Sequence, residues 1–518
     1  MNKIKLESLV ILILLLIIVS YTLFAEDVFS ISGNPVLETC GDYEVGFRII
    51  EVNYINSTEK ERRMPVAIWY PSHGVTSSYE YMEGGGGKVT GNVILNGKPS
   101  SCEQFPLILF SHGWTACGVQ SIFFTEELAR HGYIVAAPDH GDSYTCSVYP
   151  DVAGELVDLD LSIFQNPQDW DNSYYVGRKD DIKVLIDAML QLNRDVNSGF
   201  YDKVNKDKIG MAGHSLGGYT TLGLSGGWGS WRDKRIKAAL MFSPFSMPYD
   251  INSDLSKVYV PVMYQGGTLD VAITPYLDAT YTNSNSPKYF PILKLSTHMA
   301  WSNTACSGYS SVKSCLQNSE KVQTINFYGI NFLDRYVKGD ISAENKLVST
   351  QSFLDSYVFN TFTTTTTTST STSTTTVIIL GETTTSTSTT TTTQEKKSSN
   401  GGSSGGGSGG GGTKIIVQES DCEEDWICFN WLACENGIEQ RECRDRNHCR
   451  TAEDKPETVR VCGIIIKEKV IVEEPEVSES FMTVMFKSLK INDPRIITSI
   501  LMLLVVILFI IYLIKRRK

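Results

Sequence analysis

Residues 207–218, DKIGMAGHSLGG, decide the fold of this chain. Residues 209–212 form a short apolar run, which is typical of a buried parallel strand. The run GHSLG at 213–217 fits the pattern G-x-S-x-G, and residues 219–224 continue as a helix-like stretch. A strand, a sharp turn and a helix in this order are the context of a nucleophile elbow, which lifts a serine hydroxyl above the edge of a sheet. The simpler interpretation is a glycine-rich turn at a helix start, with no chemical role.

The region around this stretch, residues 34–360, alternates between strand-like and helix-like segments. The expected strands are 46–54, 65–70, 106–111, 133–137, 208–212, 238–242, 259–265 and 289–295. The expected helices are 121–131, 179–193, 219–224, 275–281 and 322–338. The later strands are continuous apolar runs separated by amphipathic segments, which predicts an α/β fold with a mainly parallel sheet and helices on both faces. Residues 139–176 lack periodicity and stand where a lid or a substrate-shaping insertion is expected.

Charge and cysteine usage limit the function and the compartment. The formal net charge is −12 and no basic stripe occurs outside the extreme ends, so we expect no nucleic-acid partner. The 12 cysteines fall into two sets of six. Even sets of cysteines beside a targeting segment predict an oxidising compartment outside the cytoplasm.

The N-terminal segment 1–25 has the features of a signal peptide. Lys3 and Lys5 precede a wholly apolar run at 9–19. The flank LFA at 23–25 departs from the A-x-A cleavage pattern, so an uncleaved N-terminal anchor also fits, but we favour cleavage at that flank.

The C-terminal segment 496–514 is predicted to be a transmembrane helix. It is almost wholly apolar, and 19 residues at 1.5 Å per residue would span about 28 Å, enough for a bilayer core. The basic tail 515–518 marks the cytoplasmic side of the membrane. We therefore expect a cell-surface protein, anchored in the cytoplasmic membrane with its large domain outside.

Residues 361–413 are expected to be a linker. The Thr- and Ser-rich run at 361–393 is typical of an O-glycosylated stalk, and the Gly- and Ser-rich run at 398–412 of a flexible tether. Asn56 lies in the only N-x-[ST] sequon, which together with the Thr- and Ser-rich run indicates a glycoprotein. On this interpretation the domain before the linker moves freely outside the cell, and a protease cut in the linker releases it.

The segment 414–475 is a compact module with six cysteines. So few residues cannot fold on an apolar core alone, so we expect disulfides to hold it together. It contains no C-x-x-C pair, which disfavours zinc.

The catalytic candidates follow from the position of each side chain after a strand. A serine hydroxyl needs a base to take its proton and an acid to orient that base, and downstream of an elbow the order is Ser, Asp or Glu, then His. Asp270 follows the expected strand 259–265, whereas Asp250 and Asp254 lie before it and Asp278 lies in a helix candidate. The base is His298, which follows the strand 289–295 and is the only histidine after Ser215 that precedes the linker. The alternatives are a helix-capping role for Asp270 and a surface-loop role for His298.

Stabilisation of a tetrahedral oxyanion needs two N–H donors. The backbone amide of Leu216 is one expected donor, and the amide of Trp114, after the strand 106–111, is the other. His112, His140 and His214 are interpreted as structural hydrogen-bonding residues. No metal and no organic cofactor are expected.

Several motifs carry a family resemblance: VGFRIIEVNY, PVAIWYP, FSHGW, HGYIVAAPDH, GRKDDIKVLIDAM, GHSLGG, GGTLD and STHMAW. Through them residues 40–340 resemble the α/β-hydrolase superfamily, in particular platelet-activating-factor acetylhydrolases, dienelactone-hydrolase-like proteins and polyester hydrolases. The resemblance implies an esterase. In the acetylhydrolases the acid resembles a position just after the preceding strand, where this chain reads MFSP at 241–244 without an Asp. Dienelactone hydrolases have a Cys nucleophile, so Ser215 argues against that activity.

The six-cysteine module resembles a thrombospondin type 1 repeat, although it has two Trp where three are common. In that family Trp and Arg side chains stack alternately, and the resemblance implies such a role for Trp426, Trp431, Arg441 and Arg444. It also implies a glycan or protein ligand, with a spacer role as the alternative.

Three disulfides are predicted in the large domain. Cys306 and Cys315 would close a short loop just after His298. Cys117 and Cys146 both follow ends of strands that should be neighbours, which leaves Cys40 to pair with Cys102.

The sequence thus predicts a membrane-anchored serine hydrolase that cleaves carboxylic esters of unknown identity. One alternative is a serine peptidase with the same triad. The other is a non-catalytic surface adhesion protein with a degenerate hydrolase domain.

Overall fold

The computed structural model describes a large part of the chain. The described residues are 40–56, 60–81, 89–143, 164, 166–363, 372–379, 382–386, 424–435, 437–447, 455–456 and 458–469. The chain divides into two compact units, Met1–Lys469 and Val470–Lys518, and the second lies wholly outside these residues. The expected signal segment 1–25, the expected membrane helix 496–514 and the tail 515–518 also lie outside them. Among the helices that are described, none is both long and apolar enough to cross a bilayer.

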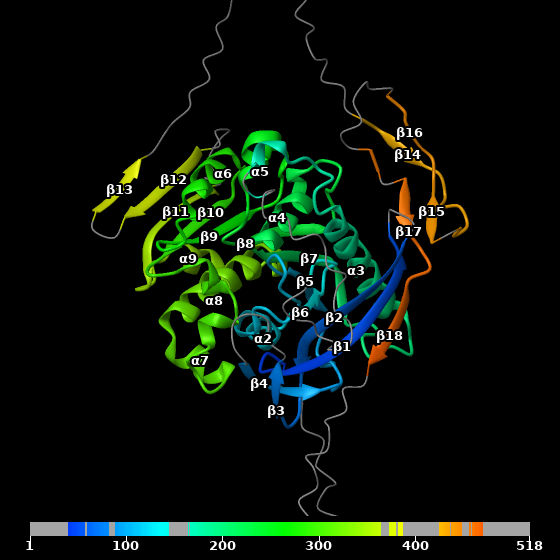
Figure 1. Ribbon diagram of the computed structural model, residues 1–518, viewed down its shortest axis with the longest axis horizontal. Coiled ribbons are helices and arrows are strands. Elements are labelled where there is room, and N and C mark those ends of the chain that lie inside the picture. The colour runs from blue at the N-terminus through cyan, green and yellow to red at the C-terminus, as the bar shows by residue number, and fades with distance from the viewer. Residues whose placement is uncertain are drawn as a thin grey trace, which may run out of the picture. The chain divides into compact units, whose positions relative to one another are not determined.

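One mixed sheet forms the centre of the first unit, in the order β13-β12-β11-β10-β9-β8-β7-β5-β6-β2-β1-β4-β3 (Figure 1). Its middle is parallel: β6, β5, β7, β8, β9 and β10 run in one direction. Antiparallel neighbours flank it on both sides, β2 and β1 beyond β6 and β11 beyond β10. The bounds are β1 Glu44–Ile55, β2 Glu61–Ser72, β3 Ser77–Tyr81, β4 Val89–Leu95, β5 Phe105–Ser111, β6 Ile134–Pro138, β7 Val204–His214, β8 Ile236–Phe242, β9 Val262–Gly267, β10 Lys288–Leu293, β11 Leu354–Thr363, β12 Thr372–Ile379 and β13 Glu382–Ser386.

Helices cover both faces of the sheet. One apolar cluster joins α3 to alternate residues of β1, β2, β5, β6 and β7, and a second joins α4, α5 and α6 to β8 and β9. On the opposite face α2 and α8 pack on β8, where Phe124 meets Phe242 edge to face. The bounds are α2 Ile122–Arg130, α3 Val176–Arg194, α4 Leu216–Leu222, α5 Met247–Asn252, α6 Leu277–Asn283, α7 Val312–Asn318, α8 Glu320–Leu333 and α9 Ala343–Leu347. The architecture is therefore the expected α/β fold.

The central strands form where the sequence predicts them because both of their faces are covered. Every residue of β5 and of β6 is buried, and such strands read as continuous apolar runs. One boundary is wrong in an instructive way: β9 begins at Val262, not at Tyr259. Pro261 has no N–H to donate to a ladder, and Tyr259 is 63% exposed.

The sheet also extends into the segment expected to be a linker. β12 and β13 lie within 361–413, and β12 pairs with β11 through residues that include Val377, Ile378 and Ile379. β-branched residues favour extended backbone, and Thr shares this property, so a Thr-rich run beside an open strand can add to the sheet.

The disulfides of the large domain agree with two predicted pairs. The structure contains Cys40–Cys102 and Cys306–Cys315. Cys117 is disulfide-bonded, and its predicted partner, Cys146, lies outside the described residues.

The six-cysteine module contains short strands and two described disulfides. The strands are β14 Trp426–Cys428, β15 Ile438–Gln440, β16 Cys443–Asp445, β17 Val459–Val461 and β18 Ile465–Lys469. The disulfides are Cys428–Cys443 and Cys434–Cys462. Although β18 lies in the range expected for the module, it pairs with β1 of the large sheet.

Candidate active site

Ser215 occupies a strained turn between β7 and α4. Its backbone has φ 54° and ψ −117°, a conformation that a residue with a side chain rarely adopts. The two flanking glycines are required by contact with backbone atoms: a Cβ on Gly213 would lie 2.3 Å from the carbonyl oxygen of Gly217, and a Cβ on Gly217 would lie 1.9 Å from that of Ser111. The turn therefore has the geometry of the expected elbow.

His298 joins Ser215 to Asp270. Its Nε2 lies 2.9 Å from Oγ of Ser215, and its Nδ1 lies 2.9 Å from Oδ2 of Asp270. Asp270 follows β9 and its side chain is 2% exposed, whereas His298 follows β10 and its side chain is 33% exposed. The structure thus brings together three residues that the sequence placed after three different strands.

Asp270 remains charged in this site. Burial raises the pKa of its carboxyl group, but hydrogen bonds from His298 and Ser243 outweigh burial and leave the pKa below its usual value. A carboxylate at Nδ1 favours the neutral tautomer with the proton on Nδ1. The lone pair of Nε2 is then free to accept the proton of the Ser215 hydroxyl.

Ser243 is a fourth residue in the hydrogen-bonded series of Ser215, His298 and Asp270, and it was not identified from the sequence. It follows β8, is fully buried and has φ 42°. Its hydroxyl donates to Oδ2 of Asp270, and its Oγ lies 3.1 Å from Nδ1 of His298. The only signal in the sequence was its position in MFSP, where the resembling acetylhydrolases have an acid.

The expected oxyanion donors lie at adjoining backbone segments. Leu216 is the first residue of α4, so its N–H has no acceptor inside the helix. The close approach of Gly217 to Ser111 and His112 brings this helix end against the loop after β5, which contains Trp114.

The orientation of the Trp114 amide follows from its neighbours. The carbonyl oxygen of Gly113 accepts hydrogen bonds from Nη2 of Arg178 at 3.1 Å and from Nδ1 of His112 at 2.7 Å. In a trans peptide the C=O and the following N–H point to opposite sides. The N–H of Trp114 therefore points away from Arg178, and no acceptor for it is found among the described residues.

A buried ion pair holds this loop from below. Arg178 binds the carboxylate of Asp142 through Nε at 3.0 Å and Nη2 at 2.6 Å, and its Nη1 donates to the carbonyl oxygen of His112 at 2.6 Å. Burial raises the pKa of Asp142, but the charge and hydrogen bonds of Arg178 have a larger, opposite effect. The resulting pKa is about 2. Neither residue was identified from the sequence, because the motif GRKDDIKVLIDAM that contains Arg178 gives it no role and a single Asp in a loop carries no pattern.

The three other histidines near the site are buried hydrogen-bonding residues. Burial and Arg178 lower the pKa of His112 and of His140, so both are neutral. Burial, followed by the charge of His298, lowers the pKa of His214 to about 3. His214 donates from Nε2 to the carbonyl oxygen of His298 at 2.8 Å, and its Nδ1 lies 2.6 Å from Nε2 of Gln120. His214 therefore joins the base loop to the loop after β5 as a positioning residue.

The alternative acids do not reach His298 by any contact in the described structure. Asp250 accepts from the Thr280 hydroxyl at 2.7 Å, and burial raises the pKa of Asp250 to about 6. Asp254 accepts from the N–H of Ser256 and caps a short helix. Across the described part of the chain, no group of three His, Cys, Asp or Glu is arranged to hold a metal ion.

Parts of this chain resemble known proteins. Residues 32–159 match the family of platelet-activating factor acetylhydrolase, isoform II, a range that ends before Ser215. Platelet-activating factor acetylhydrolase of Canis lupus familiaris is 27% identical over 200 residues, which are 34% of this chain and 43% of that protein. The enzyme of the same name from Cavia porcellus is 23% identical over 270 residues, 43% of this chain and 58% of its own length.

A solved structure is also similar. The ferulic acid esterase from Streptomyces cinnamoneus is 17% identical, with a TM-score of 0.44, and the match covers 61% of this chain and 96% of that chain. The chain spans about half the length of the curated relatives described above. The family model and both curated relatives are thus described as platelet-activating factor acetylhydrolases.

Proposed function

We propose that this protein hydrolyses carboxylic esters through an acyl-enzyme, with Ser215 as nucleophile, His298 as general base and acid, and Asp270 as the acid that orients His298. The observation that carries the proposal is the double contact of His298, 2.9 Å from Ser215 and 2.9 Å from Asp270. The resemblance to platelet-activating factor acetylhydrolases supports an ester rather than an amide substrate.

Acylation starts with attack of the Ser215 oxygen on the ester carbonyl carbon. The hydroxyl proton moves to Nε2 of His298, and the Asp270 carboxylate stabilises the imidazolium. The amides of Trp114 and Leu216 donate to the oxyanion, whose negative charge appears only as the tetrahedral intermediate forms. When the intermediate collapses, the C–O bond to the leaving group breaks and His298 gives its proton to the leaving alkoxide.

Deacylation repeats these steps with water. His298 takes a proton from a water molecule, whose oxygen attacks the acyl carbon of the ester on Ser215. Collapse of the second intermediate returns the proton to the Ser215 oxygen and releases a carboxylic acid. The enzyme ends in its starting protonation state, so no cofactor is consumed.

A fluorophosphonate probe tests the proposal directly, because it labels only an activated serine. The parent protein should be labelled and should hydrolyse at least one p-nitrophenyl ester. Ser215→Ala should show neither reaction, with Ser225→Ala as a matched control that should keep both. A folded parent protein that is neither labelled nor active on esters would contradict the proposal, and cleavage of a peptide panel but not of the esters would favour a peptidase.

We further propose that the protein is anchored at the cell surface by the helix 496–514, with the catalytic domain outside. The apolar sequence of this segment, its basic flank 515–518 and the disulfides of the described domains support this location. Labelling intact cells with a membrane-impermeant amine reagent tests it: lysines of the large domain should react before lysis.

The six-cysteine module is proposed to be a thrombospondin type 1-like repeat with a glycan or protein ligand. Two guanidinium groups lie over the ring of Trp431, that of Arg441 4.3 Å and that of Arg460 4.4 Å from the ring centroid. This stacking supports the resemblance, although Arg444 contacts Phe429 and Lys455, not an Arg, lies over Trp426. Loss of binding to a glycan array by Trp431→Ala would support a glycan ligand.

A further inference from the structure

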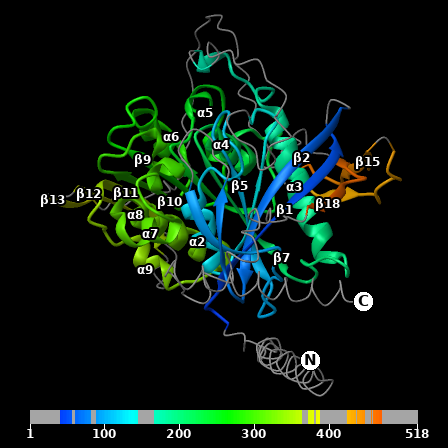
Figure 2. The same ribbon diagram turned by 60° about the horizontal axis from the view of Figure 1, so that its bottom comes forward.

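The outer edge of β1 is shared between two partners. On its inner side β1 pairs with β2 along its full length. On its outer side β4 pairs only with Gly46 and Phe47, and β18 pairs with the five residues from Ile49 to Asn53. Figure 2 shows β18 beside β1. Without β18 this stretch would expose the unpaired N–H and C=O groups of an edge strand.

The side chains of β18 distinguish an inner and an outer face. Ile466 of β18 and Ile464, directly before the strand, are partly buried and pack against the core cluster that contains Ile50 and Val52. Ile465, between them, is 58% exposed. This alternation is the pattern of a strand that has one face on a core.

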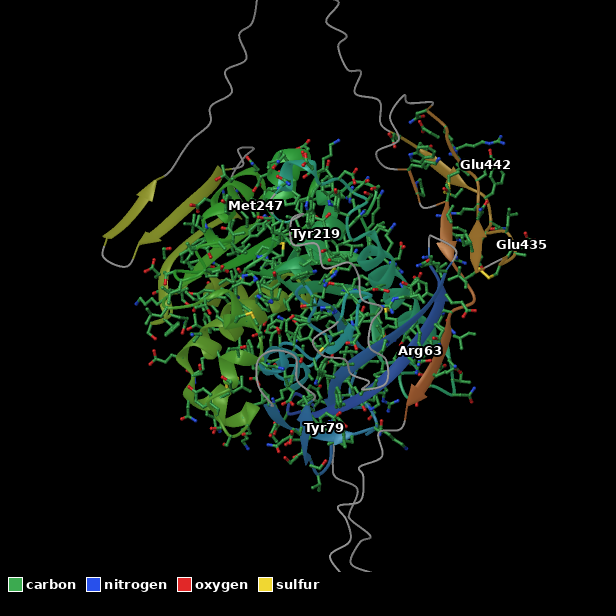
Figure 3. The ribbon with its side chains drawn as sticks, in the orientation of Figure 1. Arg63, Tyr79, Tyr219, Met247, Glu435 and Glu442 are labelled. Atoms are coloured by element: carbon green, nitrogen blue, oxygen red, sulfur yellow. A yellow bond between two sulfur atoms is a disulfide. The ribbon has the colours of Figure 1, made fainter. Side chains whose placement is uncertain are left out.

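Charged groups fix the register of the pair. Glu468 lies 3.1 Å from Nη1 of Arg48, whose side chain is only 8% exposed, and this is the one ion pair of Arg48 among the described residues. Lys467 lies 3.9 Å from Glu51, which also accepts from Arg63 of β2. Figure 3 shows Arg63 on the strands beside β18. Removal of β18 would leave the largely buried guanidinium group of Arg48 without the carboxylate of Glu468.

The six-cysteine module is attached directly to this strand. Cys462, in the disulfide with Cys434, is three residues before Ile465, a distance of at most about 10 Å along the chain. Gly437 of the module lies against the end of β1, where a Cβ would be 2.9 Å from Cβ of Ile55. The module therefore contacts the large domain both through β18 and next to it.

We propose that β18 is an intramolecular tether, which holds the six-cysteine module on the catalytic domain without the linker between them. The occupant of the β1 edge is thus a segment of this same chain. A flexible linker raises the local concentration of a docking segment to about the millimolar range. In the intact chain, therefore, the affinity of β18 for β1 cannot be separated from the effect of the linker. Cutting the linker removes this contribution. The inference does not depend on the proposed reaction.

The experiment uses the full chain, purified in detergent, with a site-specific protease sequence inserted between Gly412 and Thr413. After cleavage at about 5 μM protein, the two fragments should elute together in size-exclusion chromatography. Non-reducing denaturing electrophoresis must show two separate bands, because a disulfide between the fragments would also keep them together. Separation of the native fragments would overturn the proposal.

Neighbouring isoleucines give a matched pair of variants. Ile466→Asp places a charge against the core and should release the catalytic fragment after cleavage, whereas Ile465→Asp changes an exposed side chain and should not. Fluorophosphonate labelling of Ser215 in both variants reports that the catalytic domain is folded. If both variants stay associated, or both separate, β18 is not the tether.

Discussion

Moving the triad carboxylate from Asp270 to Ser243 tests the geometry of the site. In the Asp270→Asn variant His298 loses its charged partner. A second substitution, Ser243→Asp, offers a new one, because Oγ of Ser243 already lies 3.1 Å from Nδ1 of His298 and an Asp carboxylate oxygen extends one covalent bond further. The backbone at 243 has φ 42°, a region in which Asp and Asn are favoured over most residues.

The size of the effect follows from the role of the acid. Replacing a triad Asp by Asn lowers kcat by about 10⁴-fold, or about 5 kcal/mol of transition-state stabilisation. The relocated carboxylate restores a negative charge beside His298 and with it the tautomer protonated on Nδ1. It approaches His298 from the end of β8 instead of β9, however, and the Asn amide at position 270 remains beside it. We therefore expect Ser243→Asp/Asp270→Asn to recover about 10- to 100-fold over Asp270→Asn alone, or about 1.4–2.7 kcal/mol.

Hydrolysis of a p-nitrophenyl ester under kcat conditions measures the recovery. The control is Ser243→Asn/Asp270→Asn, which has the same shape at both positions but no charge. Thermal unfolding shows whether each variant is folded. If the folded Asp variant is no more active than its Asn counterpart, a carboxylate at 243 does not reach His298 and cannot take the place of Asp270.

Three further predictions concern catalysis, a buried charge and pH. Ser215→Ala should lower kcat by about 10⁶-fold in an ester assay, with an unchanged melting temperature because Gly213 and Gly217 shape the turn. Arg178→Gln should destabilise the fold by about 3–5 kcal/mol in urea unfolding, because it leaves the Asp142 carboxylate buried and unpaired. Burial raises the pKa of Asp250 to about 6, so the folded protein retains this proton between about pH 4 and 6 while the unfolded chain releases it. Stability from this group therefore falls as pH rises through that window, and Asp250→Asn should be about 1–2 kcal/mol more stable than the parent at pH 8 but not at pH 4.

The central half of the fold could be predicted because its signals are local. Strands such as β5 and β8 are continuous apolar runs bounded by polar residues, which only a sheet covered on both faces buries. Strands β4 and β11, which lie outside the central parallel part of the sheet, were missed because they lack such a signal. Gly91 and Asn92 interrupt the apolar residues of β4, and β11 runs directly into the Thr-rich segment, so neither strand forms a continuous apolar run.

The same distinction applies to the site. Ser215, Asp270 and His298 could be proposed because each follows a recognisable strand, and parallel strands bring their carboxyl ends to one edge of the sheet. Ser243, Gln120 and Arg178 are common polar residues to which no motif gives a role. Their role appears only from the residues that they contact across the fold.

The pairing of β18 with β1 is the extreme case, because the two partners of its ion pair, Arg48 and Glu468, are 420 positions apart. Between them lies a segment whose composition by itself indicates two independently moving domains. Composition describes how a linker behaves in isolation. Whether the domains stay together depends on the β1 edge, which binds β18 through backbone hydrogen bonds and through the ion pair of the buried Arg48. A flexible linker and a docked module are therefore compatible, and the linker then sets how readily the module returns to the β1 edge rather than how far it stays away.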